Sequence, residues 1–385
     1  MNIMIAGYTY IHDGYRSTFD HYPPTDSLFF LLPKKWKARW GAATFVAKPA
    51  KNIFTTDTFF YHSRYPIIRG LLKGWMPLFP FFLWKLRRQH GISLVYTCTE
   101  PTLLTGLYNG CWSKLFGVKH ILFTWENIPY HFGGLKGFFR KAVLRLNLAV
   151  SDGIVCGNKK GKDICQAITR KPLAVIPPFG LDHRFFAPVK IDKKFMGHDL
   201  GNTIVFTFVG AVAFRKGVHH IINAFQGVAA KMPHTRLILA GNDEYGPELE
   251  DRIRTSPAQN NIIKLPFLSH EQLRMLLAVS DVFVYPSLSY QGWEEQFGYS
   301  MAEASLMELP VISTRTGSIE DVVVDGDTGF LVEPGNEQEL SETMIKLAEN
   351  ADLRARMGQA GRAYIMNQFS QQAVANKFYD FFHRV

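Results

Sequence analysis

Short apolar runs alternate with helix-length mixed segments along the whole chain of 385 residues. In the first half the apolar runs are Asn2–Gly7, Ser27–Leu32, Ser93–Cys98, Lys119–Thr124, Gly153–Cys156 and Leu173–Ile176. In the second half they are Ile204–Val209, Arg236–Ala240, Asn261–Leu265, Asp281–Tyr285, Pro310–Ser313 and Gly329–Val332. Near-continuous apolar strands separated by helices indicate parallel sheets that are covered on both faces. The sequence therefore predicts an α/β fold with two doubly wound domains facing each other across a cleft.

The segment Ile176–Asp182 marks the predicted domain boundary, because its two prolines and its glycine favour a stiff hinge over a continued element. We expect an N-terminal domain over residues 1–180 and a C-terminal domain over residues 181–369. Residues 370–385 carry apolar side chains at helical spacing, which predicts an amphipathic helix. We expect this last helix to pack back toward the N-terminal domain.

Charge is distributed unevenly between the two halves. Residues 1–186 contain 25 lysines and arginines against 9 acidic residues, whereas residues 187–385 contain 18 against 24. A strongly basic half favours an anionic partner, such as a phospholipid surface, a nucleic acid or an acidic substrate.

Cysteine usage and hydropathy indicate the compartment. The four cysteines show neither CxxC spacing nor a dense even framework, which is typical of a reducing compartment. The most apolar stretch, Gly74–Trp84, has about half of the ~20 residues that a membrane-spanning helix needs. We expect a cytoplasmic protein, at most peripheral on the inner face of the membrane.

The strongest chemical signal is Pro286-Ser287 followed by two glutamates, Glu295 and Glu303, that flank seven residues. Gly298 between them lets the backbone approach a ligand, and free N–H groups at a helix start suit a phosphate. If both glutamates were helical they would lie ~12 Å apart, beyond the ~5–9.5 Å of a glycosidase carboxylate pair. We therefore expect each glutamate to bind a different part of one extended ligand.

A second signal follows the predicted strand that ends before Gly210, where Arg215-Lys216-Gly217 opens the next helix. Ligands bind at the carboxyl ends of parallel strands, and a planar guanidinium beside a compact ammonium suits a diphosphate. The sequence contains neither GxxxxGK[ST] nor GxGxxG, so ATP hydrolysis and dinucleotide redox chemistry lack their usual motifs.

Together these motifs resemble the donor domain of GT-B retaining glycosyltransferases of family 4. The similarity extends from about Asp152 to the C-terminus and includes a further ordered run. This run comprises Pro310-Val311-Ile312-Ser313-Thr314, Gly317, Glu320, Gly326 and Gly329-Phe330-Leu331-Val332.

The resemblance implies a GT-B fold and a sugar transfer with retention from a nucleotide-sugar, without a cofactor or an essential metal. It implies that Arg215 and Lys216 hold the donor diphosphate, that Glu303 binds the ribose, and that Glu295 lies by the sugar as a catalytic residue. The remaining implied donor-binding positions are Gly210, Phe297, Gly298, Tyr299 and Ser300. The sequence has no His/Cys cluster at metal-ligand spacing.

This chain departs from the family pattern in two places. Ala211 stands where many members carry arginine, so Arg215 would have to take over that role. Trp125-Glu126-Asn127 stands where members often place a histidine, so Glu126 is either a catalytic partner of the acceptor hydroxyl or a structural residue.

Three further residues are acceptor-side candidates. Gly7, Glu100 and Asn127 each follow a predicted strand of the basic half. For Glu100 the alternative is a cap on the following helix.

Aromatic and basic residues are interleaved over Phe59–Arg88 and again over Lys34–Trp40. Such a pattern suits anionic headgroups, and the alternatives are an apolar core helix with a basic end and a solvated turn.

We therefore expect a hexosyltransferase whose acceptor is a glycan or a lipid-linked glycan at the membrane surface. A GT-B nucleotide-sugar epimerase and a nucleic-acid-binding protein are the alternatives. Nothing beyond the charge supports nucleic acid as a partner.

Overall fold

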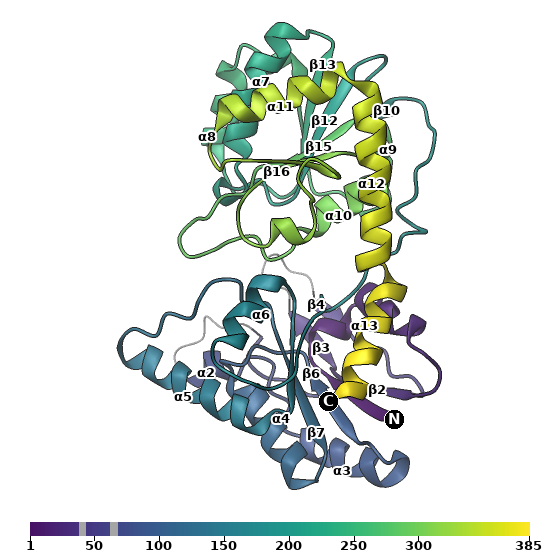
Figure 1. Ribbon diagram of the computed structural model, residues 1–385, viewed down its shortest axis with the longest axis vertical. Coiled ribbons are helices and arrows are strands. Elements are labelled where there is room, and N and C mark those ends of the chain that lie inside the picture. The colour runs from purple at the N-terminus through teal and green to yellow at the C-terminus, as the bar shows by residue number, and fades with distance from the viewer. Residues whose placement is uncertain (38–43, 62–67) are drawn as a thin grey trace. The chain divides into compact units, whose positions relative to one another are not determined.

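Figure 1 shows the protein as a computed structural model, which describes residues 1–37, 44–61 and 68–385. The chain forms two compact units. The N-terminal unit comprises Met1–Gly180 and Gln371–Val385, and the C-terminal unit comprises Leu181–Ser370.

The N-terminal unit is built on a parallel sheet of seven strands in the order β5-β2-β1-β6-β7-β8-β9. The strands are β1 (Asn2–Ala6), β2 (Ser27–Pro33), β5 (Ile53–Thr56), β6 (Leu94–Thr97), β7 (Lys119–Thr124), β8 (Gly153–Cys156) and β9 (Leu173–Val175). At the centre, Ile5 of β1 is paired with Phe30 of β2 and with Tyr96 of β6. The strand order reverses between β1 and β6, which makes this pair the topological switch point of the sheet.

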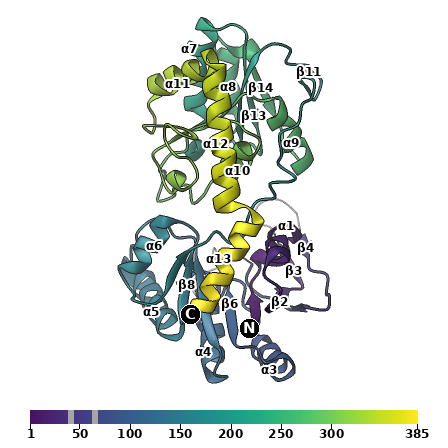
Figure 2. The same ribbon diagram turned by 45° about the vertical axis from the view of Figure 1, so that its right-hand side comes forward.

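Helices cover both faces of this sheet. On one face lie α3 (Phe79–His90), α4 (Leu104–Leu115) and α5 (Gly134–Val150), with α4 packed between the other two. On the other face lie η2 (Ser17–His21) and α13 (Gln371–Arg384), and Figure 2 shows α13 beside β6 and β8. The shorter helices of this unit are η1 (Thr9–Ile11), α1 (Asp13–Arg16), α2 (Ile68–Leu71) and α6 (Lys159–Gln166).

The last helix completes the core of the N-terminal unit. The aromatic rings of Phe378 and Phe382 are buried, and Phe378 lies 5.2 Å from the ring of Phe19 in η2. The amphipathic pattern of residues 370–385 therefore reflects burial against this face of the sheet.

An antiparallel hairpin of β3 (Lys35–Lys37) and β4 (Thr44–Val46) accounts for part of the basic cluster Lys34–Trp40. Trp36 is buried and stacks on Tyr8 with 4.1 Å between ring centroids. The expectation that this ring serves an interface, or sits in a solvated turn, is wrong. Residues 38–43 of the cluster, and residues 62–67 of the Phe59–Arg88 segment, lie outside the described residues.

The C-terminal unit is built on a parallel sheet of six strands in the order β14-β13-β12-β15-β16-β17. The strands are β12 (Ile204–Val209), β13 (Thr235–Ala240), β14 (Ile262–Leu265), β15 (Val282–Tyr285), β16 (Val311–Thr314) and β17 (Gly329–Val332). In chain order this is 3-2-1-4-5-6, the arrangement of a dinucleotide-binding Rossmann sheet. Its switch point lies between β12 and β15.

Three of the six main helices of the C-terminal unit begin at a side-chain cap. The main helices are α7 (Val218–Lys231), α8 (Pro247–Thr255), α9 (His270–Val279), α10 (Tyr299–Leu306), α11 (Glu337–Glu349) and α12 (Ala351–Phe369). Ser269 and Gln272 form a capping box on α9, and Asn336 and Asn350 cap α11 and α12. The minor elements are β10 (Lys194–Phe195), β11 (His198–Asp199), η3 (Phe214–Lys216), η4 (Gln259–Asn261) and η5 (Ile319–Asp321).

The predicted α/β class with two doubly wound parallel sheets is confirmed. The alternation of apolar runs did not reveal the edge strand β5, the β3–β4 hairpin or the 19-residue helix α12. Among the described residues, no helix is both long enough and apolar enough to cross a bilayer.

Candidate functional site

The switch point of the C-terminal sheet gathers the strongest candidates. The strand order reverses between β12 and β15, and open α/β sheets have their ligand crevice beyond the carboxyl ends of the strands at such a point. The loop after β12 carries Arg215 and Lys216, and the loop after β15 carries Glu295.

Lys216 and Glu295 form a buried ion pair at this crevice. The two residues are 7% and 8% exposed, and Lys216 Nζ donates a hydrogen bond to Glu295 Oε2. The Tyr285 hydroxyl donates to the same carboxylate oxygen over 2.9 Å. Burial lowers the pKa of Lys216, and the neighbouring Glu295 opposes that shift. A cation in a buried site of low dielectric constant interacts more strongly with an anionic ligand than a cation in water does.

Trp293 lies over both cations of the crevice. Its ring is 4.4 Å from Lys216 Nζ and 5.4 Å from Arg215 Cζ. A short hairpin holds the ring, because Tyr290 and Trp293 exchange two backbone hydrogen bonds of 2.9 Å. Arg215 Nη1 also donates to Glu244 Oε2 over 2.7 Å. The second cation therefore has a defined orientation, with its guanidinium between a carboxylate and an indole.

Two glycines allow the loops of the crevice to pack closely. A Cβ atom at Gly217 would lie 2.0 Å from the Pro286 carbonyl oxygen, and one at Gly317 would lie 2.2 Å from the Glu295 carbonyl oxygen. Both glycines have a positive φ, of 67° and 54°. The Ser318 N–H donates to that same Glu295 carbonyl over 2.8 Å. The loops after β12, β15 and β16 thus support one another.

Helix α10 begins directly after Gly298, and no side chain caps its N-terminus. An uncapped helix start offers N–H groups to an anion. Glu303 lies one turn into this helix, whereas Glu295 lies in the preceding loop. The condition behind the ~12 Å estimate, that both carboxylates lie in one helix, is therefore not met.

The Glu303 side chain is partly buried and ends in a carboxyl group. Within the part of the chain that the structure describes, it has no hydrogen-bond or ion-pair partner. Burial raises the pKa of Glu303 to about 8. A carboxyl left without partners in such a place is costly to the fold, which is typical of a binding residue.

The other donor-side candidates surround this helix start. Phe297 is buried and packs edge-on against Phe369 at 5.0 Å, so only its backbone can face a ligand. Tyr299 packs on Phe297 with 4.6 Å between ring centroids, and the Ser300 hydroxyl hydrogen-bonds to Tyr285. A Cβ atom at Gly210 would lie 3.3 Å from the Tyr285 ring, so the backbone there runs close to the crevice.

Glu100 follows β6 at the switch point of the N-terminal sheet, but it is not a helix cap. The N-cap position of α4 is Leu103, and no side chain caps that helix. The Glu100 carboxylate instead accepts hydrogen bonds of 2.7 Å from Thr124 Oγ1 and from the Trp125 N–H. Burial raises the pKa of Glu100 to about 7, although both hydrogen bonds oppose the shift. This carboxylate holds the loop that follows β7.

Glu126 and Asn127 lie in that loop. Burial raises the pKa of Glu126, and hydrogen bonds from the backbone N–H groups of Ile128 and Asn127 oppose the shift. These contacts favour the structural alternative for Glu126. Asn127 is buried, and Gly7 faces Cys98, where an added Cβ would lie 3.1 Å from the Cys98 carbonyl oxygen.

The sequence reasoning missed Tyr285, Trp293 and Glu244. Tyr285 is the last residue of β15, so its place at the carboxyl edge was a usable signal. Trp293, a large aromatic residue in the loop after β15, was a second usable signal.

Cavities border the C-terminal sheet at both ends of its strands. One of about 500 Å³ lies after β13 and β14, where it is lined by Asn242, Asp243, Lys264 and Phe267. Asp243 and Lys264 form an ion pair of 2.6 Å there. This cavity is at the carboxyl edge, on the same side of the sheet as the crevice.

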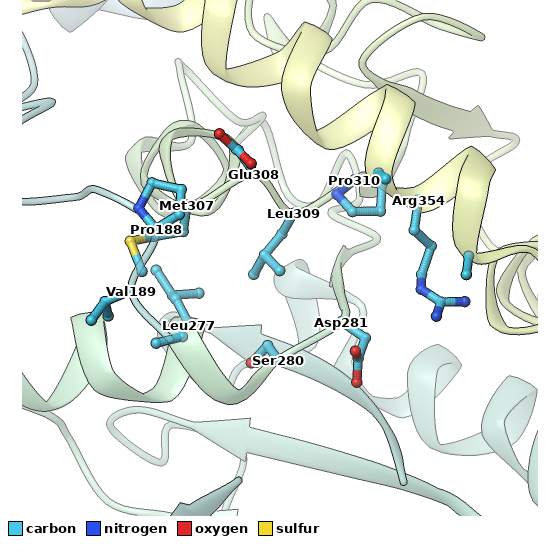
Figure 3. A pocket seen from close by; sticks show the side chains of 13 residues that line it. Pro188, Val189, Leu277, Ser280, Asp281, Met307, Glu308, Leu309, Pro310 and Arg354 are labelled. Atoms are coloured by element: carbon cyan, nitrogen blue, oxygen red, sulfur yellow. The ribbon is translucent and has the colours of Figure 1, made fainter. Parts of the chain in front are cut away.

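Another cavity, of about 310 Å³, lies at the opposite edge and is shown in Figure 3. Its charged side chains are already paired. Asp281 accepts from Lys193 Nζ over 2.7 Å and from the Val205 N–H over 2.8 Å. Arg354 donates to the carbonyl oxygen of Ala348 over 2.8 Å. This cavity is therefore a weaker candidate. Among the described residues, no group of three His, Cys, Asp or Glu side chains could hold a metal ion.

Residues 191–364, which lie within the C-terminal unit, match the family described as "Glycosyl transferases group 1". The similarity to the group 1 glycosyl transferases therefore concerns this unit. The chain is 30% identical over 187 residues to the capsular polysaccharide biosynthesis glycosyltransferase CapM of Staphylococcus aureus, covering 48% of this chain and 47% of that protein. It is also 30% identical over 206 residues to a GDP-mannose-dependent phosphatidylinositol monomannoside mannosyltransferase of Corynebacterium glutamicum, covering 52% and 53%. The match thus spans about half the length of these curated relatives.

Solved glycosyltransferase structures share the fold of the whole chain. Anabaena Alr3699/HepE in complex with UDP has a TM-score of 0.73 at 18% identity, with all of both chains covered. The sucrose-phosphate synthase of Thermosynechococcus elongatus has a TM-score of 0.73 at 16% identity, covering 100% of this chain and 98% of that one. At this identity the likeness concerns the fold, and the expected GT-B class is confirmed.

Proposed function

We propose that this protein is a hexosyltransferase of family 4 type that moves a sugar from a nucleotide-sugar, with retention, to a glycan or lipid-linked acceptor. The observation that carries the proposal is the buried Lys216–Glu295 pair at the switch point of the C-terminal sheet. The family match of the same unit supports it. So does the presence of UDP in the HepE complex, a structure with the same fold.

In this proposal the diphosphate of the donor lies between the cations and the start of α10. Lys216 uses one of its three N–H donors on Glu295, which leaves the others for a phosphate oxygen. Arg215 adds a planar fork beside it. As the sugar departs, negative charge develops on the diphosphate, and fixed cations with helix N–H groups stabilise that charge.

The two carboxylates would hold different parts of the donor. Glu295, anchored by Lys216 and by Tyr285, would face the sugar. Glu303 would accept hydrogen bonds from the ribose hydroxyls, which would supply the partners that it lacks. We propose that the reaction needs no metal ion, because the two cations already neutralise the leaving group. Chelation with EDTA should then leave the transfer rate unchanged.

The proposals for the acceptor side and for the cellular location rest on the positive charge of the N-terminal unit. We propose that the basic N-terminal unit faces an acidic membrane surface on the cytoplasmic side, where a lipid-linked acceptor would be available. The loops with Gly7, Glu100 and Asn127 are the candidate acceptor contacts.

The test is nucleotide binding followed by product analysis. UDP, GDP and ADP, with their sugars, are screened by thermal shift, since a ligand at ~100 times its Kd adds ~2.7 kcal/mol of stability. We expect one nucleotide family to stabilise the protein and Glu303→Ala to abolish that shift. Glu271→Ala is the matched control, because Glu271 is exposed in the first turn of another helix. The absence of nucleotide binding by the wild-type protein would overturn the proposal. Conversion of the nucleotide-sugar to an epimer in a reaction without acceptor would indicate an epimerase.

A further inference from the structure

The helical layer formed by α3, α4 and α5 contains no acidic residue. The sequences of these three helices include eight lysines and arginines and neither aspartate nor glutamate. All three cover the same face of the N-terminal sheet. The outer surface of this layer therefore lacks local charge compensation, unlike an ordinary solvated face with both signs interspersed.

Helix α5 also exposes large apolar side chains. Leu135, Phe138, Phe139 and Leu146 are between 47 and 74% exposed. Their spacing of three, one and seven residues places them on one stripe of the helix. Val143, Leu144 and Asn147 of the same helix are buried, and α5 packs on α4. The helix thus has large apolar side chains both where it is buried and where it faces outward.

Two cations flank this stripe. Lys141 and Arg145 are exposed one turn apart, and no acidic residue occurs between Glu126 and Asp152. Helix α3 repeats the combination on a smaller scale. Phe81 and Trp84 are exposed there, and the Arg88 guanidinium lies 4.8 Å from the centre of the Trp84 ring.

Charge and hydrophobicity together identify the occupant of this surface. A second copy of the chain would bring its own uncompensated cations against the first. A nucleic acid would supply phosphates but no apolar layer for four large side chains. An anionic bilayer supplies phosphates and acyl chains in adjacent planes, which matches a row of cations beside an apolar stripe.

We propose that α5 lies in the headgroup region of an anionic bilayer, with Leu135, Phe138, Phe139 and Leu146 directed toward the acyl chains. Lys141 and Arg145 would contact lipid phosphates, and the exposed face of α3 would add a second, weaker contact. This inference deepens the membrane location proposed above and rests on that proposal for its biological purpose. Binding to lipid itself does not require the donor site to be active.

Flotation with vesicles tests the proposal. The full chain is mixed with vesicles of pure phosphatidylcholine or with 30% phosphatidylglycerol, at low and at high salt. We expect binding to the anionic vesicles only, weakened by salt. The double variant Lys141→Ala/Arg145→Ala should bind about 30-fold more weakly, since each cation at an anionic surface is worth about fivefold.

The variant Phe138→Ser/Phe139→Ser should also lose flotation. Val46→Ser is the matched control, because Val46 is an apolar residue of the same unit that is 68% exposed outside the helical layer. It should bind as the wild type does. Folding of every variant is checked by circular dichroism and by the nucleotide-induced thermal shift, which should be retained. If the proposed donor function is wrong but the lipid contact is right, the protein should still float with anionic vesicles and should show no nucleotide-induced thermal shift.

Quenching by brominated lipid gives a second measurement that does not depend on loss of binding. A tryptophan introduced as Phe139→Trp should be quenched in anionic vesicles, whereas one introduced as Val46→Trp should not. Equal binding to neutral and anionic vesicles would overturn the proposal. So would unchanged flotation of the Phe138/Phe139 variant, or a wild-type dimer that this variant converts to a monomer.

Discussion

The two units have the same kind of parallel sheet but use its switch point differently. In the C-terminal unit the loops beyond β12 and β15 bring a buried cation, Lys216, against Glu295. In the N-terminal unit the loops beyond β1 and β6 bring Gly7 against Cys98, and Glu100 binds the next loop of its own sheet. One switch point holds a buried cation paired with a carboxylate, and at the other a carboxylate fixes the backbone of the next loop. The same topology therefore provides a place for chemistry without determining which chemistry occurs there.

Removal of the buried cation should have the largest effect. Lys216→Ala leaves Glu295 buried without its partner, and loss of one member of a buried pair costs about 3–5 kcal/mol. It also removes a donor to the developing diphosphate charge, so we expect a loss of about 10²–10³ in kcat. Urea unfolding and initial-rate assays measure the two effects. Lys73→Ala, in the N-terminal unit, should leave donor binding intact, and an equal loss there would break the comparison.

The second prediction uses pH to separate the units. Glu303 and Glu100 have pKa values of about 8 and about 7, each raised by burial above the ordinary 4.5. The folded state then binds more protons than the unfolded state, so each group stabilises the fold at low pH and loses that contribution as pH rises through the folded value. Glu303→Gln should flatten the fall in Tm between pH 4.5 and about 8, and Glu100→Gln should flatten it only up to about 7. Identical profiles for the wild type and both variants would contradict this.

A third, smaller effect is expected at Trp293. A ring over a desolvated cation contributes up to ~2 kcal/mol, and Trp293 lies over two cations. Trp293→Ala should weaken nucleotide binding about fivefold to tenfold, as measured by calorimetry. Trp84→Ala, which removes a ring over Arg88 on α3, is the matched control and should not affect the nucleotide.

The smallest effect is expected at Glu126. Because its carboxyl is held by backbone N–H groups of its own loop, Glu126→Gln should lower the transfer rate by no more than about threefold. A loss above a hundredfold, with nucleotide binding unchanged, would instead assign it to the acceptor hydroxyl.

Much of the C-terminal site was predictable, because loops after apolar strands meet at one edge of a parallel sheet. That rule alone brings Lys216 and Glu295 together. The contacts of Tyr285, Glu244 and Trp293 were not, since they depend on how loops fold back on one another. The conditional estimate of the separation of Glu295 from Glu303 does not apply, because α10 begins only after Gly298.

The exposed stripe of α5 illustrates a different limit. A helix that is apolar on both sides gives no periodicity from which its outward side could be read. Only the burial of Val143 and Leu144 in the folded unit shows which residues remain outside. The basic-aromatic Phe59–Arg88 segment drew attention to α3 instead, where Phe79 and Leu83 are core residues.

The hairpin that carries Trp293 has a consequence for altering the protein by design. Its two backbone hydrogen bonds close the turn locally, and Gln291 and Gly292 at the tip are exposed. Segments of other lengths could replace this tip while the ion pair beneath it stays anchored by Tyr285. The turn is therefore a natural position at which to vary the loop above the Lys216–Glu295 pair without disturbing that pair.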